Sequence, residues 1–94
     1  MRVAYTSEAT GDLDRIHAYI AEQSPRAATA VSAAIRKLAE GLADFPFMGH
    51  PTHTKGVLVL TLRRYSFRIF YRLTGDEVQI LHIRHDSRAE WQSS

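Results

Sequence analysis

Residues 57–88 read VLVLTLRRYSFRIFYRLTGDEVQILHIRHDSR, and they contain the clearest strand pattern in the chain. Between residues 65 and 73 an apolar or aromatic side chain recurs at every second position, as Tyr65, Phe67, Ile69, Tyr71 and Leu73. Side chains two residues apart on a strand point to the same face of a sheet. The pattern therefore predicts a strand over residues 65–73 with one buried face.

Two more strands are predicted next to this one. Residues 74–77 are turn formers, and Gly75 can adopt a positive φ. Residues 78–84 then resume an apolar, β-branched run, so the two segments make a hairpin. Residues 57–62 are a continuous apolar run that is too short for a lone helix and rich in strand formers. Together the three runs predict an antiparallel meander.

The first half of the chain has helical periodicity instead. After a strand-prone segment at residues 2–5, Thr6 or Ser7 offers an N-cap, and Glu8 suits the first turn of a helix. This helix is expected to end near residue 23, with Asp12 and Asp14 outside its apolar stripe. The stripe consists of Ala9, Leu13, Ile16 and Ile20.

A second helix is predicted to begin at Ser24-Pro25, because serine caps helices and proline suits the first helical turn. Its apolar stripe is Val31, Ile35, Leu38 and Leu42, and several alanines would allow the two helices to approach closely as a hairpin. Residues 44–56 contain Pro46, Gly49, Pro51 and Gly56 and are expected to form a loop.

The predicted order is strand, helix, helix, strand, strand, strand. This order indicates an α+β fold in which the helical hairpin packs on one face of a small, mainly antiparallel sheet. A chain of 94 residues is expected to form one domain, over residues 1–94, with residues 89–94 as a loosely ordered tail.

Composition limits the functional classes. Cysteine is absent, which excludes disulfides and thiol nucleophiles. No apolar run approaches the roughly 20 residues of a membrane span, and no signal peptide is visible, so a cytoplasmic protein without a membrane partner is expected. The net charge of +2 is unevenly distributed, because residues 48–94 carry seven basic residues against four acidic ones.

Neither a metal nor a cofactor is expected. The chain has two His-x-x-His pairs, His50/His53 and His82/His85. Side chains three apart on a strand point to opposite faces, so His82 and His85 do not suit a single ion. The first pair lies in a proline-containing loop with no third ligand nearby. No glycine-rich phosphate loop or Gly-x-Ser-x-Gly motif occurs.

Arginines interleaved with aromatic residues are the remaining signal. Alternation places Arg68 and Arg72 on the face opposite the aromatic stripe, and on the last strand it separates His82 and Arg84 from Leu81, Ile83 and His85. Such a cluster could bind an anionic partner, stabilise developing negative charge or transfer protons. An ordinary polar sheet face would show the same pattern, and spacing alone does not separate these possibilities.

The chain as a whole resembles the RelE/ParE toxin superfamily of bacterial type II toxin–antitoxin systems. The segments that carry the resemblance run from Tyr5 to Arg88 and are DLDRI…YIAE (residues 12–22), SPRAA (24–28), LADFP…G (42–49), YSFRIFYR (65–72) and ILHIRH…R (80–88). The resemblance implies a helical hairpin on a small sheet, with the first strand inserted beside the later ones. It also implies an antitoxin partner, ParD-like or related, through which alone the complex would contact DNA.

Two mechanisms occur within the superfamily. RelE-like members cut mRNA on the ribosome with basic side chains of the sheet face, whereas ParE-like members inhibit DNA gyrase. Arg68 matches an arginine that both branches have. Thr61 and Val59 stand where a RelE-like nuclease has lysines, and Trp91 is the only aromatic residue after His85, although indole cannot act as a base.

Other features of the sequence look more ParE-like. These are the SPRAA link between the helices and the HDSR ending at residues 85–88. Leu58 departs from the pattern, since many ParE-like sequences have an arginine at the matching position. The resemblance therefore favours a non-enzymatic gyrase inhibitor; the alternatives are a ribosome-dependent mRNA endonuclease and a degenerate member that only binds antitoxin.

These readings assign candidate roles to individual residues. Target binding is assigned to Arg64, Arg68, His85 and Arg88. Antitoxin binding is assigned to Leu13, Ile16, Ile20, Leu58 and Leu60. If the protein were a nuclease, its catalytic residues would be Arg68, His82, Arg84 and His85.

Overall fold

The computed structural model describes residues 1–86. Its elements are strand β1 (Arg2–Tyr5), helices α1 (Ser7–Ala21) and α2 (Pro25–Glu40), 3-10 turn η1 (Gly41–Ala43), strands β2 (His50–Pro51) and β3 (Leu58–Leu62), 3-10 turn η2 (Arg63–Tyr65), and strands β4 (Phe67–Thr74) and β5 (Glu77–His85). Arg88, Trp91 and the predicted tail lie outside the described residues.

Both helices begin at the predicted capping residues. Thr6 Oγ1 accepts a hydrogen bond from the backbone N–H of Ala9 at 3.1 Å, and Ser24 Oγ accepts one from Ala27 at 3.1 Å. Each cap satisfies a backbone donor that has no partner within its own helix. Pro25 occupies the first turn of α2, where its missing N–H is no loss.

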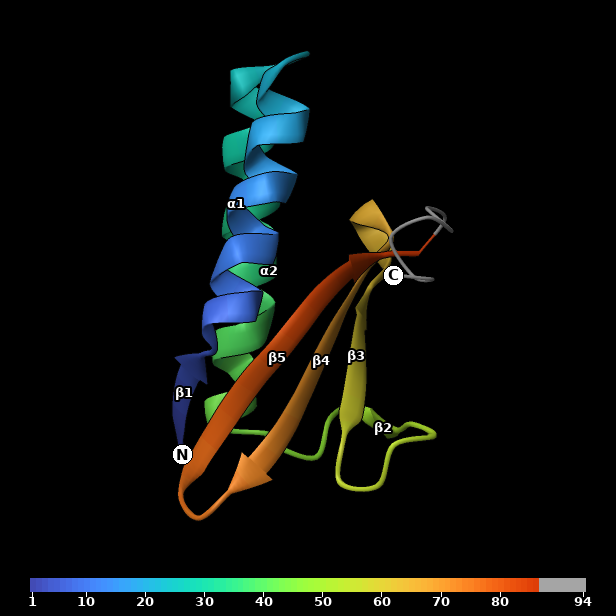
Figure 1. Cartoon of the computed structure of the whole chain (residues 1–94). Helices are drawn as coiled ribbons and strands as arrows, with labels where there is room; N and C mark the ends of the chain where they lie inside the picture. The colour runs from blue at the N-terminus through green and yellow to red at the C-terminus, as the bar shows by residue number, and fades with distance from the viewer. Residues whose placement is uncertain (87–94) are drawn as a thin grey trace.

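The helical hairpin covers one face of a five-stranded sheet (Figure 1). The strand order is β1-β5-β4-β3-β2, with β1 parallel to β5 and the other pairs antiparallel. The α+β class, the mainly antiparallel sheet and the insertion of the first strand beside the last are therefore confirmed.

The core lies between the hairpin and this face of the sheet. The helices contribute the buried side chains Ala9, Leu13, Ile16, Val31, Ile35 and Ala39, and η1 contributes Leu42. The strands contribute Leu60, Phe67, Ile69, Tyr71, Val78, Ile80 and Ile83. Burial of apolar area on this scale is the main stabilising term for such a domain.

Three sequence predictions were wrong in detail. The strand predicted from Tyr65 begins at Phe67, because η2 occupies residues 63–65 and Ser66 adopts a left-handed conformation with φ of 61°. The loop predicted over residues 44–56 contains the short strand β2, which pairs with β3. Asp12, assigned to a polar position, is buried with 6% of its surface exposed.

A bulge in β5 decides which side chains face outward. Phe70 pairs with His82 and Tyr71 with Ile80, so Leu81 has no partner on β4. Val78 and Ile80 face the core before the bulge, and Ile83 faces it afterwards. The side chains of His82 and Arg84 consequently start from the outer face of the sheet, while His85 lies on the helix side, across from Phe67.

Candidate functional site

The outer face of β4 and β5 carries the polar cluster that the sequence indicated. Arg68 pairs with Arg84 across the two strands, and Phe70 pairs with His82. These four side chains line a shallow depression of about 260 Å³. The structure thus brings together three of the four residues named as a possible catalytic set.

The fourth, His85, is on the other face of the sheet. Its ring makes an edge contact with Phe67, with the ring centroids 5.0 Å apart. It borders a groove of about 150 Å³ between the hairpin and the sheet, lined also by Ile16, Tyr19, Ile20, Val31 and Tyr65. His82 and His85 therefore cannot act on the same atom, as the alternation along the strand predicted.

Both arginines of the depression are paired with a carboxylate. Arg68 forms an ion pair with Asp86 through its Nε. Arg84 Nη1 donates to Asp12 Oδ2 at 2.8 Å, and its Nη2 lies 3.3 Å from His82 Nδ1. The same ring nitrogen, His82 Nδ1, also lies 3.7 Å from Asp12 Oδ2.

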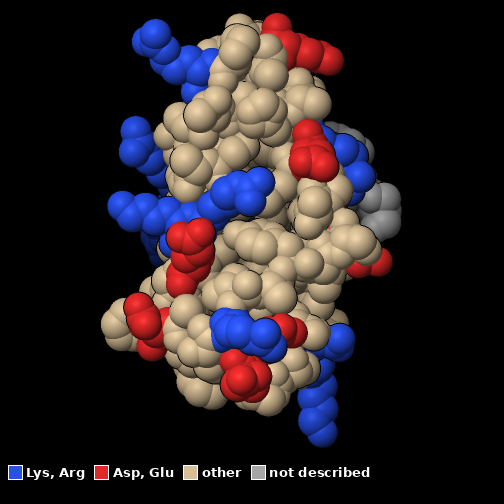
Figure 2. All heavy atoms as spheres, turned by 90° about the vertical axis from the view of Figure 1, so that its left-hand side faces the viewer, with Lys and Arg blue, Asp and Glu red and all other residues tan. Residues whose placement is uncertain are grey.

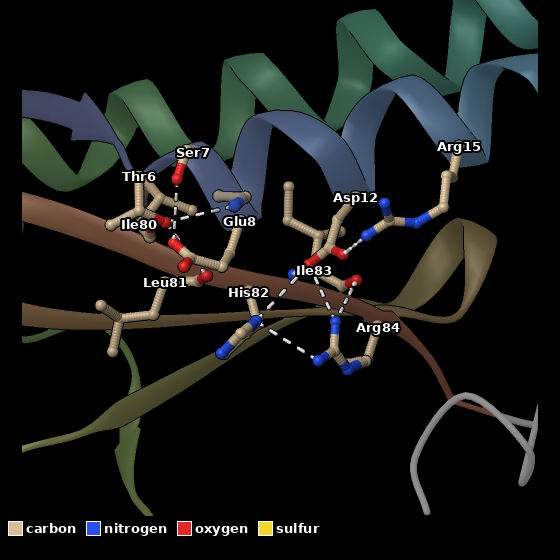
Figure 3. A network of polar contacts seen from close by, with 11 residues as sticks. Thr6, Ser7, Glu8, Asp12, Arg15, Ile80, Leu81, His82, Ile83 and Arg84 are labelled. Carbon is tan, nitrogen blue, oxygen red and sulfur yellow. Dashed lines mark hydrogen bonds and ion pairs between the residues drawn. The ribbon is translucent and has the colours of Figure 1, made fainter. Parts of the chain in front are cut away.

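Asp12 is the centre of this network (Figure 3). One carboxylate oxygen, Oδ1, accepts from Arg15 Nη2, and the other, Oδ2, accepts from Arg84 and from the backbone N–H of Ile83 at 3.0 Å. Burial of a carboxylate is tolerable only when its oxygens are satisfied in this way. Sequence analysis missed Asp12, although its position four residues before Ile16 already placed it on the apolar stripe.

Helix α1 also completes the hydrogen bonding of β5 where β1 ends. Thr6 Oγ1 lies 2.8 Å from the carbonyl oxygen of Ile80 and 3.2 Å from that of Leu81, and Asp12 accepts from Ile83 further along. Polar side chains of the helix thus replace the missing strand along this edge, which Figure 3 shows. The bulged segment of β5 is consequently held against α1.

The outer face of β3 adds no positive charge beside the depression. Thr61 lies opposite Arg68, and Val59 lies opposite Phe70. These are the two positions at which the resemblance led us to look for lysines. Neither side chain carries a positive charge or acts as a general base at neutral pH.

The remaining assigned residues differ in accessibility. Arg64 is exposed on η2, with its guanidinium carbon 5.2 Å from the ring centre of Tyr65. Leu13, Ile16 and Leu60 are buried in the core, whereas Ile20 and Leu58 are partly exposed. The predicted antitoxin contact, which stays a prediction, can involve only the last two of these side chains without a change of conformation.

An exposed aromatic pair was not anticipated from the sequence. Phe45 and Phe47 are 67% and 77% exposed, in the loop after η1. Tyr71 holds this loop, because its Oη donates to the carbonyl of Pro46 at 2.8 Å and accepts from the N–H of Gly49 at 2.9 Å. Two phenylalanines within a proline- and glycine-containing loop were the available signal.

Tyr71 is poorly placed for acid–base chemistry. Its side chain is fully buried, and burial raises the pKa of its hydroxyl above the ordinary value of 10.0, although the hydrogen bond from Gly49 acts in the opposite direction. Burial likewise raises the pKa of Tyr5, with smaller effects from Arg36 and Glu40. Both phenols therefore serve as structural groups near neutral pH.

The helix side of the molecule does not present a field of one sign. Figure 2 shows both acidic and basic side chains on this face, with basic ones gathered along its upper left edge. Within residues 1–86, no three His, Asp or Glu side chains come together to hold a metal ion. No helix in this part of the chain is long and apolar enough to cross a membrane.

Residues 3–90 match the family described as "ParE toxin of type II toxin-antitoxin system, parDE". The chain is 36% identical over 90 residues to the candidate toxin Y4kP of Sinorhizobium fredii, with 96% of this chain and 92% of the relative covered. Both findings concern nearly the full length of the sequence.

Solved structures of toxins have the same fold. A chain of the chromosomal ParDE system of P. aeruginosa has a TM-score of 0.80 and 32% identity, over 90% of this chain and 95% of that one. A chain of the RelBE2 toxin–antitoxin complex of Mycobacterium tuberculosis has a TM-score of 0.64 and 27% identity, over 89% and 95%. The isolated E. coli RelE toxin shares the fold at 14% identity, with a TM-score of 0.69 over 98% and 90%.

Proposed function

The chain belongs to the ParE toxin family of type II toxin–antitoxin systems, and on this premise we propose that it is a non-enzymatic inhibitor of DNA gyrase in the cytoplasm, neutralised by direct binding of a cognate antitoxin. The similarity to a chain of a ParDE system supports the ParE branch. The observation that carries the proposal is the composition of the outer sheet face.

The described part of that face offers few of the groups that RNA cleavage needs. Cleavage requires a base for the 2′-hydroxyl, a positioned cation for the developing phosphorane charge and an acid for the leaving oxygen. Among the described residues His82 is the one imidazole that lines the depression, and the two arginines beside it are already paired with Asp12 and Asp86. Val59 and Thr61 provide no further cation.

An mRNA endonuclease is the second candidate, because Arg68, His82 and Arg84 do line one depression. The experiment that separates the two functions measures both activities of the purified chain. We expect inhibition of gyrase supercoiling in vitro and intact mRNA in a reconstituted translation reaction. Codon-positioned cleavage that His82→Ala abolishes, with supercoiling unaffected, would reject the gyrase proposal.

The target-binding residues are now proposed on two separate surfaces. Arg68 is on the outer face, whereas His85 is on the helix side beside the groove. Comparing Arg68→Ala with His85→Ala in the supercoiling assay identifies the surface that contacts gyrase, provided that both variants keep the wild-type thermal midpoint. Arg88 also stays in the proposal and lies outside the described residues. If both variants inhibit supercoiling as well as wild type does, neither Arg68 nor His85 belongs to the target surface.

The antitoxin is proposed to be a ParD-like, DNA-binding protein. Its contact is proposed to centre on Ile20, beside the groove between hairpin and sheet, and on Leu58 of β3, which lines a depression with Pro51 and Leu73. Co-expression of the two proteins followed by pull-down tests the contact. If the chain binds the antitoxin but inhibits neither gyrase nor translation, it is the degenerate member considered above.

A further inference from the structure

Asp12 has an unusual position for an acidic side chain in this protein. It lies on the core side of α1, and its side chain is only 7% exposed. The other acid of the same helical turn, Asp14, is exposed. A buried carboxylate adds little stability compared with an apolar side chain of similar size. The role of Asp12 is therefore to be found in the contacts that it makes.

The contacts of Asp12 determine where Arg84 points. The Arg84 side chain starts from the outer face, yet only 26% of it is exposed. Its Nη1 donates to Asp12 Oδ2 at 2.8 Å and lies 3.5 Å from the carbonyl oxygen of Ile83, while Nη2 donates to His82. Both terminal nitrogens are thus engaged within the protein, as Figure 3 shows.

We propose that Asp12 is a positioning residue that holds Arg84 against α1 and keeps its charge from external phosphate, so that the outer sheet face is specific for a protein surface over nucleic acid. A phosphate that bound Arg84 would have to displace a carboxylate that is nearly buried and already satisfied. Displacement would leave that carboxylate with an uncompensated oxygen, which is strongly unfavourable.

This inference rests on the proposed gyrase function, because selection against phosphate matters for a toxin whose target is a protein. It also predicts that Arg68 and Arg84 do not create a nucleic-acid site. Arg68 is held in the same manner by Asp86, although that pair is more exposed, with fractions of 47% and 34%. Asp12 therefore restrains its arginine more firmly than Asp86 does.

The test measures binding of the full-length chain, released from co-expressed antitoxin, to a single-stranded RNA oligonucleotide across a salt series. Asp12→Asn keeps an oxygen that can accept from Ile83 but removes the charge that holds Arg84. For single strands, each additional phosphate contact steepens the slope of the logarithm of the association constant against the logarithm of the salt concentration by about 0.7. Between 1 M and 50 mM salt, one such contact therefore adds a factor of about eight to the gain in affinity. We expect this change in Asp12→Asn.

Asp14→Asn is the matched control, because it makes the same change of net charge on the same helix without touching Arg84. We expect its affinity to change by less than about twofold, since it acts only through a screened field. Adding Arg84→Gln to Asp12→Asn should return the slope to the wild-type value. Equal slopes in Asp12→Asn and Asp14→Asn would overturn the inference.

A second comparison does not depend on the folding of Asp12→Asn. In the otherwise wild-type chain, Arg84→Gln should leave the slope unchanged, whereas Arg72→Gln should lower it, since Arg72 is exposed on the same face. A loss in Arg84→Gln as large as that in Arg72→Gln would show that Arg84 is accessible and would reject the inference. Gyrase takes no part in these measurements, so the inference and the proposed function can fail separately.

Discussion

Replacing Tyr71 with phenylalanine tests how the loop with the exposed aromatic pair is held. Tyr71 is fully buried, and its hydroxyl bridges the carbonyl of Pro46 and the N–H of Gly49. Phenylalanine keeps the ring and removes only this bridge. Tyr5→Phe is a matched control, because the buried hydroxyl of Tyr5 has no hydrogen-bond partner among the described residues.

The two substitutions should differ clearly in stability. Tyr71→Phe leaves two backbone groups without their partner, which costs about 1 to 3 kcal/mol. In a domain of this size that lowers the thermal midpoint by roughly 4 to 8 °C per kcal/mol. Tyr5→Phe removes a hydroxyl that gains nothing from burial, so we expect it to be neutral or stabilising.

Urea unfolding followed by circular dichroism measures both variants, and pH provides an independent readout. Burial raises the pKa of Tyr71 and of Tyr5, so folded protein holds these protons more tightly than unfolded protein does. Their contribution is complete below pH 10 and is lost as the pH rises further. Each variant should lose less stability than wild type above pH 10. Equal stability of Tyr71→Phe and Tyr5→Phe, within about 0.3 kcal/mol, would refute the bridging role.

Three further substitutions, one of them with a matched control, test the packing and the partner surface. Gly49→Ala should lower the free energy of unfolding by about 1 to 3 kcal/mol, because an added Cβ would lie 2.7 Å from Tyr71 Oη; wild-type stability in urea would contradict the close approach. Asp12→Ala should lower the free energy of unfolding by about 2 to 4 kcal/mol, which is less than the loss for a fully buried ion pair because Arg84 is partly exposed. Asp14→Ala should change the free energy of unfolding by no more than about 0.5 kcal/mol. Similar losses in the two variants would count against the network. Ile20→Ser should weaken binding of co-expressed antitoxin at least about tenfold in pull-down titrations, and unaltered binding would move the contact elsewhere.

The helices and the class of the fold could be predicted because local signals and tertiary packing agree. Thr6 and Ser24 cap helices by their own side chains, and the apolar stripes that follow become the buried face. The aromatic alternation of β4 likewise matches its buried positions from Phe67 onward. Such agreement between local preference and the final fold is what makes a prediction from one sequence succeed.

The details that failed depend on partners distant in sequence. Residues 50 and 51 form a strand only because β3 lies beside them, and a two-residue strand has no periodicity of its own. Asp12 is buried because Arg84, 72 positions away, compensates its charge. The loop that carries the exposed Phe45 and Phe47 is bonded to Tyr71 through Pro46, a contact that no local pattern encodes.

The bulge in β5 links the sequence pattern to the candidate site. In an unbulged strand that continued the phase of Val78 and Ile80, His82 and Arg84 would face the core and Ile83 would face solvent. The extra residue, Leu81, reverses the phase. The spacing of three between Ile80 and Ile83 is the trace of this reversal in the sequence.

The reversal also explains why Asp12 is needed. A bulged strand loses regular pairing, and on the edge away from β4 the strand β5 has no neighbouring strand after the pair Tyr5–Ile80. Asp12 accepts the N–H of Ile83 and draws Arg84 toward α1, so one side chain both secures the bulged segment and restrains the cation that the bulge exposes. Stability and specificity of the outer face therefore depend on the same carboxylate, and only a substitution such as Asp12→Asn, which keeps an acceptor for Ile83 while removing the charge, can separate the two roles.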